Sequence, residues 1–254
     1  MNSYITGQID CRRLNCSSFN LEYRERKMPI KAVCFDLCGT LAYNENAVSD
    51  QAASRFLVDR GYKVYPQAFR AAWSYVSFVD YPNHGYKTWK PQLDQVLKRL
   101  GIKVDNQTSK DLAVLYENVR WKTFPDAENA ISTAKTVGLK TAIVTTISQF
   151  KYEKALKPFR DKIDLLVDGY TFHCEKSNPK IYLKTLETLE VKASETVMIG
   201  DDVELDILLP KTLGMHTILL DRTGKFSDAK GKEASFVVKN LNEAAEKLKF
   251  LVNP

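Results

Sequence analysis

A carboxylate stands at the end of a short apolar run near the start of the chain. The run extends from Ala32 to Phe35, Asp36 follows it directly, and a break comes at Gly39. An apolar run bounded by a turn signal is typical of a parallel strand covered on both faces. Because open α/β sheets bind ligands beyond the carboxyl ends of their strands, Asp36 is well placed for chemistry. The alternative is that Asp36 only caps the turn that follows.

Two further polar groups suit chemistry on a phosphoryl group. The apolar stretch that begins at Ala142 ends in Thr145 and Thr146. Thr145 could donate a hydrogen bond to a phosphoryl oxygen, or it could form a local turn with the backbone. Lys176 lies in the segment Glu175-Lys-Ser-Asn-Pro-Lys-Ile-Tyr. Beside Asp36 its cation would favour the ionised carboxylate and balance phosphate charge, although most lysines are simply solvated.

A cluster of acids follows a second apolar run. The segment Val197-Met-Ile-Gly is followed by Asp201, Asp202 and, after a short interval, Asp206. Carboxylates gathered at the end of an apolar strand repel one another unless a cation joins them, and Mg²⁺ is the usual one. The plainer alternative, for Asp202 and Glu204, is a set of acids at the N-terminus of a helix.

Taken in order, these four segments resemble the four motifs of the haloacid dehalogenase superfamily. The resemblance implies that Asp36 is a covalent nucleophile. It implies that Thr145 donates to the phosphoryl oxygen and that Lys176 is the motif lysine, with Ser177 where proline is commoner.

The resemblance also implies a metal site and its supports. The expected Mg²⁺ ligands are the carboxylate of Asp36, the main-chain carbonyl of Cys38 and the carboxylate of Asp201. Asp202 or Asp206 would orient Lys176 or the loop.

Position 38 departs from the pattern of the phosphatases in this superfamily. Those enzymes usually carry a second acid two residues after the nucleophile, where this chain has Cys38. The 2-haloacid dehalogenases lack that acid too, but they work without metal and carry a small polar residue where Asp201 stands. We therefore predict a Mg²⁺-dependent phosphatase of a small phosphorylated metabolite that forms an aspartyl-phosphate. The alternatives are a metal-independent 2-haloacid dehalogenase acting through an aspartyl-ester, and a non-catalytic phospho-ligand-binding relative.

Helical spacing of apolar residues dominates the chain from Asp50 to about Arg120, with Ser49 as a plausible N-cap. We expect an all-α cap over 45–121, inserted after the first motif, and an N-terminal extension over 1–27. Pro82 and Gly85 predict a loop over 80–89 that is rich in aromatic residues. The expected substrate-binding residues lie near the first two motifs and in this loop: Cys38, Gly39, Thr40, Thr146, Tyr86 and Trp89.

The remaining segments, 28–44 and 122–254, predict an α/β core. Strands expected at 140–145, 163–167, 196–199, 217–220 and 235–238 alternate with helices, which favours a parallel sheet. The resemblance implies a Rossmann-like three-layer α/β/α fold with strand order 5-4-1-2-3. Strands 1 and 4 then lie side by side and bring Asp36 close to Asp201.

Composition narrows the class of protein. The chain has 254 residues, 44% of them hydrophobic, and a net charge of +6 spread over its length. No apolar run approaches the roughly 20 residues that span a bilayer, and no signal peptide is visible. We expect a cytoplasmic protein whose partner is a small anionic substrate rather than nucleic acid or membrane. Its odd number of cysteines, five, argues against a disulfide framework.

Overall fold

The computed structural model describes residues 29–226 and 233–252. The predicted extension 1–27, with Cys11 and Cys16, lies outside the described residues. Cys34, Cys38 and Cys174 are free thiols. Among the described residues no helix is long and apolar enough to cross a bilayer.

A six-stranded sheet forms the centre of the larger part of the molecule. All its neighbouring strands are parallel, in the order β5-β4-β1-β6-β7-β8. The expected order is thus confirmed, and the strand expected near residue 235 extends the sheet at one edge. In β1, Phe35 pairs with Ile143 on one side and Ile199 on the other. The strands are β1 (Ala32–Phe35), β4 (Lys140–Val144), β5 (Leu165–Val167), β6 (Thr196–Gly200), β7 (His216–Leu220) and β8 (Phe236–Val238).

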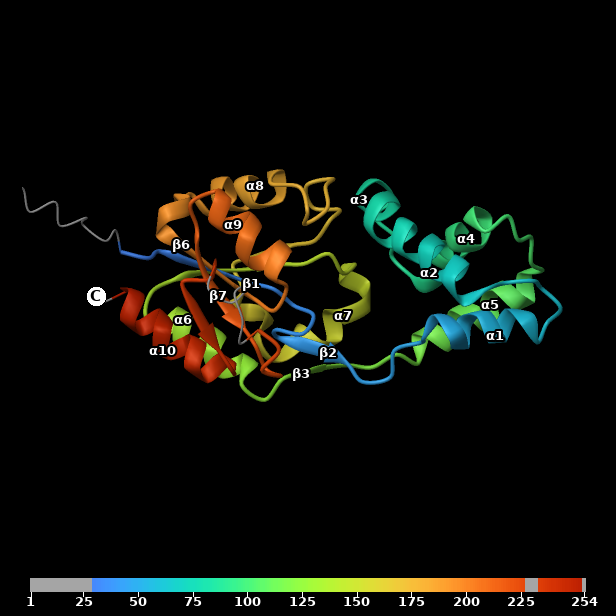
Figure 1. Ribbon diagram of the computed structural model, residues 1–254, viewed down its shortest axis with the longest axis horizontal. Helices are drawn as coiled ribbons and strands as arrows, with labels where there is room; N and C mark the ends of the chain where they lie inside the picture. The colour runs from blue at the N-terminus through green and yellow to red at the C-terminus, as the bar shows by residue number, and fades with distance from the viewer. Residues whose placement is uncertain (1–28, 227–232, 253–254) are drawn as a thin grey trace, which may run out of the picture.

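Helices cover both faces of this sheet, as Figure 1 shows. Because side chains alternate along a strand, Val33 and Phe35 of β1 pack into one core cluster, while Ala32 and Cys34 pack into another. The first cluster takes in α6 (Ala127–Thr136), α7 (Gln149–Leu156), the 3₁₀ segment η2 (Lys157–Lys162) and α10 (Leu241–Val252). The second takes in α8 (Lys180–Leu189) and α9 (Leu209–Thr212), with the 3₁₀ turn η3 (Ala193–Glu195) at its edge. The predicted three-layer α/β/α architecture is confirmed.

A helical region with its own hydrophobic core extends from one end of the sheet (Figure 1). Leu57, Phe69, Leu93 and Leu112 are buried at its centre. Ser49 accepts the expected capping bond from the N–H of Ala52 at 3.1 Å. The elements are α1 (Asp50–Val58), α2 (Pro66–Tyr75), the π-helical turn η1 (Val76–Asp80), α3 (Tyr81–His84), α4 (Trp89–Arg99) and α5 (Asn106–Glu117).

Two short antiparallel strands, β2 (Ala42–Asn44) and β3 (Trp121–Thr123), join the helical region to the core. They pair where the chain leaves the core and where it returns, near the predicted boundaries after residues 44 and 121. A strand of three residues is too short to show a recognisable alternation of apolar and polar residues. The sequence pattern therefore did not predict this pair.

The loop expected over 80–89 is partly helical. The π-helical turn runs directly into α3, and only Gly85, at φ +58°, ends the helix. Pro82 lies at the start of α3 directly after the π-helical turn, and its fixed φ is compatible with helical backbone there. Here the helical region rests on the core, through hydrogen bonds from the Tyr81 hydroxyl to Asp168 and between His173 Nδ1 and the Pro82 carbonyl at 2.7 Å.

Candidate active site

The expected nucleophile and motif lysine meet at the carboxyl edge of the sheet. Asp36 follows β1 and is 7% exposed, and Lys176 is 2% exposed. The ammonium of Lys176 forms ion pairs with Asp36 and, at 2.6 Å, with Asp206. Burial alone would lower the pKa of Lys176, but the carboxylates of Asp206 and Asp36 outweigh it and hold that pKa well above its ordinary value. Lys176 is therefore a permanent cation beside Asp36.

Asp201 follows β6, the strand next to β1, and faces the same edge. The hydroxyl of Thr40 donates to its carboxylate at 3.0 Å. Gly39 has φ +89°, and a Cβ at that position would overlap the Asp201 carboxylate. Glycine is therefore needed here for both backbone conformation and close approach. Burial, and next the negative charge of Asp36, raise the pKa of Asp201.

The expected supporting acids have different tasks. Asp206 is fully buried, and its carboxylate accepts from the N–H of Asp202 at 3.1 Å as well as pairing with Lys176. Asp202 instead caps the π-helical turn η4 (Val203–Leu208), accepting from the N–H groups of Glu204 and Leu205, both at 2.9 Å. Asp206 thus holds Lys176, and Asp202 holds the loop that carries Asp206.

Three of these acids form a group that could hold a cation. Carboxylate oxygens of Asp36, Asp201 and Asp206 lie within 4.8 Å of one another. Lys176 pairs with both Asp36 and Asp206, so one lysine charge faces three carboxylates and a deficit of positive charge remains. Oxygen ligands of this kind suit a hard divalent cation.

The two threonines after β4 differ in their surroundings. Thr145 is 1% exposed, and its hydroxyl oxygen accepts from the N–H of Ile147 at 3.1 Å. That is the local turn weighed above as the alternative, and it leaves the hydroxyl hydrogen available for donation to a ligand. Thr146 lines the cavity described next, together with Cys38.

A cavity of about 290 Å³ lies between the core and the helical region, and Cys38 and Thr146 border it on the core side. The pKa of the Cys38 thiol is raised to about 12 by desolvation and then by the charges of Asp36 and Asp201, so at neutral pH it is a weak donor. Four aromatic side chains of the helical region line the opposite side: Trp73, Phe78, Trp89 and Tyr116.

Tyr86 lies apart from this cavity. It is 8% exposed, belongs to the core of the helical region, and stacks on His84 with ring centroids 5.8 Å apart. Trp73, Tyr116 and Lys151 line the cavity without having been expected there. The helical spacing at Trp73 and Tyr116 was visible in the sequence, but it could not show which face met the site.

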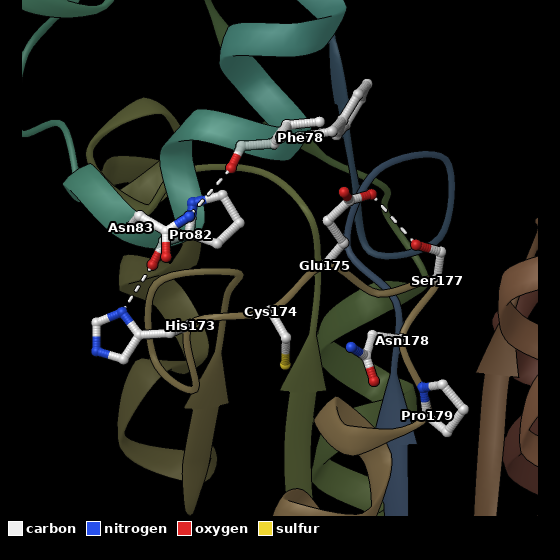
Figure 2. Close-up of a pocket in the computed structure, with 10 residues that line it drawn as sticks. Phe78, Pro82, Asn83, His173, Cys174, Glu175, Ser177, Asn178 and Pro179 are labelled. Atoms are coloured by element: carbon white, nitrogen blue, oxygen red, sulfur yellow. Dashed lines mark hydrogen bonds between the residues drawn. The ribbon is translucent and has the colours of Figure 1, made fainter.

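A second hollow of about 500 Å³ lies on the outside of the same junction (Figure 2). Its lining includes Pro82, His173 and Ser177, and Figure 2 shows the His173 ring directed at the Pro82 carbonyl. Although Glu175 and Ser177 flank Lys176 in sequence, Lys176 itself turns into the core toward Asp36. The larger hollow is therefore separate from the acidic group.

Comparisons with known proteins agree with this arrangement. A curated relative, the glyceraldehyde 3-phosphate phosphatase of Methanocaldococcus jannaschii, is 27% identical over 87% of this chain and 98% of its own length. Among solved structures, a HAD phosphatase from Thermococcus onnurineus has a TM-score of 0.61 and 23% identity, over 86% of this chain and 98% of that one. A 2-haloacid dehalogenase from Pseudomonas syringae has a TM-score of 0.64 and 21% identity, over 87% and 99%.

The two structural likenesses show a shared fold and do not separate the two chemistries. The family model for haloacid dehalogenase-like hydrolases matches residues 30–214, which is most of the chain. On this match, the chain belongs to the haloacid dehalogenase-like hydrolases.

Proposed function

We propose that this hydrolase is a Mg²⁺-dependent phosphatase of a small phosphorylated metabolite, with Asp36 as the covalent nucleophile. The observation that carries the proposal is the position of Asp201 beside Asp36, at the carboxyl ends of two neighbouring strands. Two carboxylates placed in this way fit a cation, and of the two candidate reactions only the phosphatase reaction needs one. The relative named as a glyceraldehyde 3-phosphate phosphatase supports the same chemistry. The cytoplasmic location expected from the sequence stays a prediction.

The residues divide the reaction between them. A carboxylate oxygen of Asp36 attacks phosphorus, the bond to the ester oxygen breaks, and an aspartyl-phosphate forms. Water then attacks phosphorus and releases phosphate and the free carboxylate. Lys176 stabilises negative charge on the phosphoryl oxygens, and Thr145 donates to one of them.

The metal would be held by Asp36, Asp201 and the main-chain carbonyl of Cys38. When bound, Mg²⁺ would supply positive charge that stabilises the phosphoryl oxygens and offsets the charge of the two carboxylates. The Cys38 side chain takes no part in that binding. Since a thiol is a poor general acid here, esters whose leaving groups need no proton should react most readily.

The test compares two substrates with and without metal. We expect phosphate release from p-nitrophenyl phosphate in Mg²⁺, none after chelation, and no chloride release from 2-chloropropionate. Asp36→Asn and Asp201→Asn should each lower phosphatase activity by at least ~10³-fold with the fold retained. The matched control is Glu204→Gln, an exposed acid in the same segment as Asp201. Chloride release that is insensitive to chelator would overturn the proposal in favour of the dehalogenase.

A further inference from the structure

Lys151 on α7 is a lysine held against aromatic rings instead of a carboxylate. Its ammonium nitrogen lies 5.0 Å from the ring centroid of Trp73, 4.9 Å from that of Trp89 and 5.6 Å from that of Phe150. Within the described residues, no carboxylate lies within ion-pairing distance of it. Two of the three rings belong to the helical region and one to the core, so Lys151 lies at the junction of the two.

This environment is unfavourable for a cation in the absence of a ligand. Burial lowers the pKa of Lys151 to about 7. Ring faces attract a cation, but more weakly than the carboxylates that surround Lys176. A partly exposed amine at this junction that has no carboxylate partner among the described residues is available to bind an anion from outside the chain.

The cavity that Lys151 lines also reaches the loops that carry the site residues. Cys38, two residues after Asp36, and Thr146, next to Thr145, border it, and Lys151 lines it with the aromatic rings. Asp50 also lines it, but its carboxylate is already paired with Arg70 at 2.6 Å. A phosphate ester with its phosphorus at Asp36 would have this cavity, which Lys151 also lines, as the space for its leaving group.

We propose that Lys151 binds a second anionic group on the leaving part of the substrate, so that the preferred substrates are small phosphate esters bearing a carboxylate or a second phosphate. This inference rests on the proposed phosphatase function and adds the class of substrate. The volume of about 290 Å³ lies near the lower end of the range for small-molecule sites, roughly 300–1,000 Å³, and suits a short carbon chain. An anion placed against Lys151 supplies the missing counter-charge, whereas a neutral leaving group does not.

The experiment uses two pairs of phosphate esters and three variants. In each pair one ester carries the additional anion: 3-phosphoglycerate against glycerol 3-phosphate for a carboxylate, and ribulose 1,5-bisphosphate against ribulose 5-phosphate for a phosphate. The readout is the ratio of kcat/KM within a pair, with p-nitrophenyl phosphate as reference. Lys151→Met keeps the length and apolar contacts but removes the charge, and Lys151→Arg keeps the charge. Lys154→Met is the matched control, an exposed lysine one turn further along α7.

We expect at least one pair to favour the anionic ester by about tenfold or more, as one charge-assisted contact allows. Lys151→Met should remove that preference, while Lys151→Arg and Lys154→Met retain it. The pair that responds identifies the carboxylate or the phosphate as the second anion. Equal ratios in the wild type and in Lys151→Met, with phosphatase activity present, would overturn this inference and leave the proposed function standing.

A binding measurement separates the inference from the reaction. If neither these esters nor p-nitrophenyl phosphate is turned over in Mg²⁺, the proposed function fails. Calorimetry on Asp36→Asn then still compares affinities for the anionic and neutral esters. A preference that Lys151→Met abolishes in this background supports the binding role of Lys151, and equal affinities overturn it.

Discussion

Two lysines near the cavity have opposite electrostatic surroundings. In the core, Lys176 lies between two carboxylates, and its pKa is held well above the ordinary value. At the junction with the helical region, Lys151 of α7 is partly exposed and lies against Trp73 and Trp89, and its pKa is lowered to about 7. Both lysines lie near one site, but among the described residues only Lys176 has carboxylate partners.

The difference indicates a division of labour. Groups that every phosphate ester needs are assembled in advance from strand ends of one sheet, where Lys176 keeps its charge without a ligand. The groups that distinguish one leaving group from another lie at the junction. There, Lys151 gains a negatively charged partner only when an anionic ligand binds. A site built this way can keep its chemistry while its specificity changes through residues of the junction.

The largest expected effect is on stability, with opposite signs for the two lysines. Lys176→Met leaves Asp36 and Asp206 buried without a cation and should lower the free energy of unfolding by about 3–5 kcal/mol. Lys151→Met removes an uncompensated charge and should raise it by about 1 kcal/mol or more at pH 7. Denaturant unfolding without metal measures both, with Lys154→Met as the control near zero. A loss of stability in both variants would remove the contrast on which the comparison rests.

The next effect is a pH dependence with a definite sign. Below about pH 7, Lys151 carries its proton in the folded and the unfolded chain. Between about 7 and the ordinary lysine pKa near 10.4, only the unfolded chain binds that proton, so the wild type should gain stability with pH relative to Lys151→Met. Anion binding needs the protonated amine, so the preference for anionic esters should fall by up to about tenfold per unit above pH 7.

The other titratable side chains lining the cavity set the controls for this profile. They are Cys38, Asp50 and Tyr116. Their effects on the shared phosphoryl group cancel in the ratio of anionic to neutral substrate, and above about pH 7 the additional carboxylate or phosphate of the anionic ester is almost fully ionised. Lys151→Met should therefore give a flat ratio between pH 7 and 9. A ratio that declines equally in Lys151→Met would assign the titration to another group.

The contrast between the two sides also explains what could be predicted from sequence. Asp36 and Asp201 each follow an apolar run, and the topology of a parallel sheet brings such strand ends together, so their proximity was predictable. Lys151 carries no comparable signal, because nothing in a polar helical segment shows that two tryptophans from other helices will surround it. Its unusual state arises from tertiary desolvation, which sequence spacing does not encode.

The turn residues between 80 and 89 led to a wrong prediction, because the same residues are compatible with a loop and with a short helix. Pro82 and Gly85 are turn residues, and they predicted a loop. The structure uses Pro82 in the first turn of a short helix and Gly85 as its left-handed end. The aromatic residues around them looked equivalent in sequence, but packing places Tyr86 in the core of the helical region and Trp89 at the cavity. The direction in which each ring points depends on that unpredicted helix.

The smallest expected effect separates those two aromatic residues. Tyr86→Phe removes a buried hydroxyl that has no hydrogen-bond partner in the part of the chain that the structure describes, so stability should stay within about 0.5 kcal/mol or rise slightly. The ratio of anionic to neutral ester should not change, because Tyr86 is not among the residues that line the cavity.

Trp89→Phe keeps an aromatic ring near Lys151 but weakens the attraction of its face for a cation. The ratio should therefore fall about two- to fivefold, equivalent to a cation–π contribution of roughly 0.5–1 kcal/mol. Steady-state kinetics on the responsive ester pair measures both variants. If Tyr86→Phe changes the ratio of anionic to neutral ester as much as Trp89→Phe does, specificity depends on the helical region as a whole. The aromatic residues around Lys151 would then have no special role, and the contrast between Lys176 and Lys151 would not explain specificity.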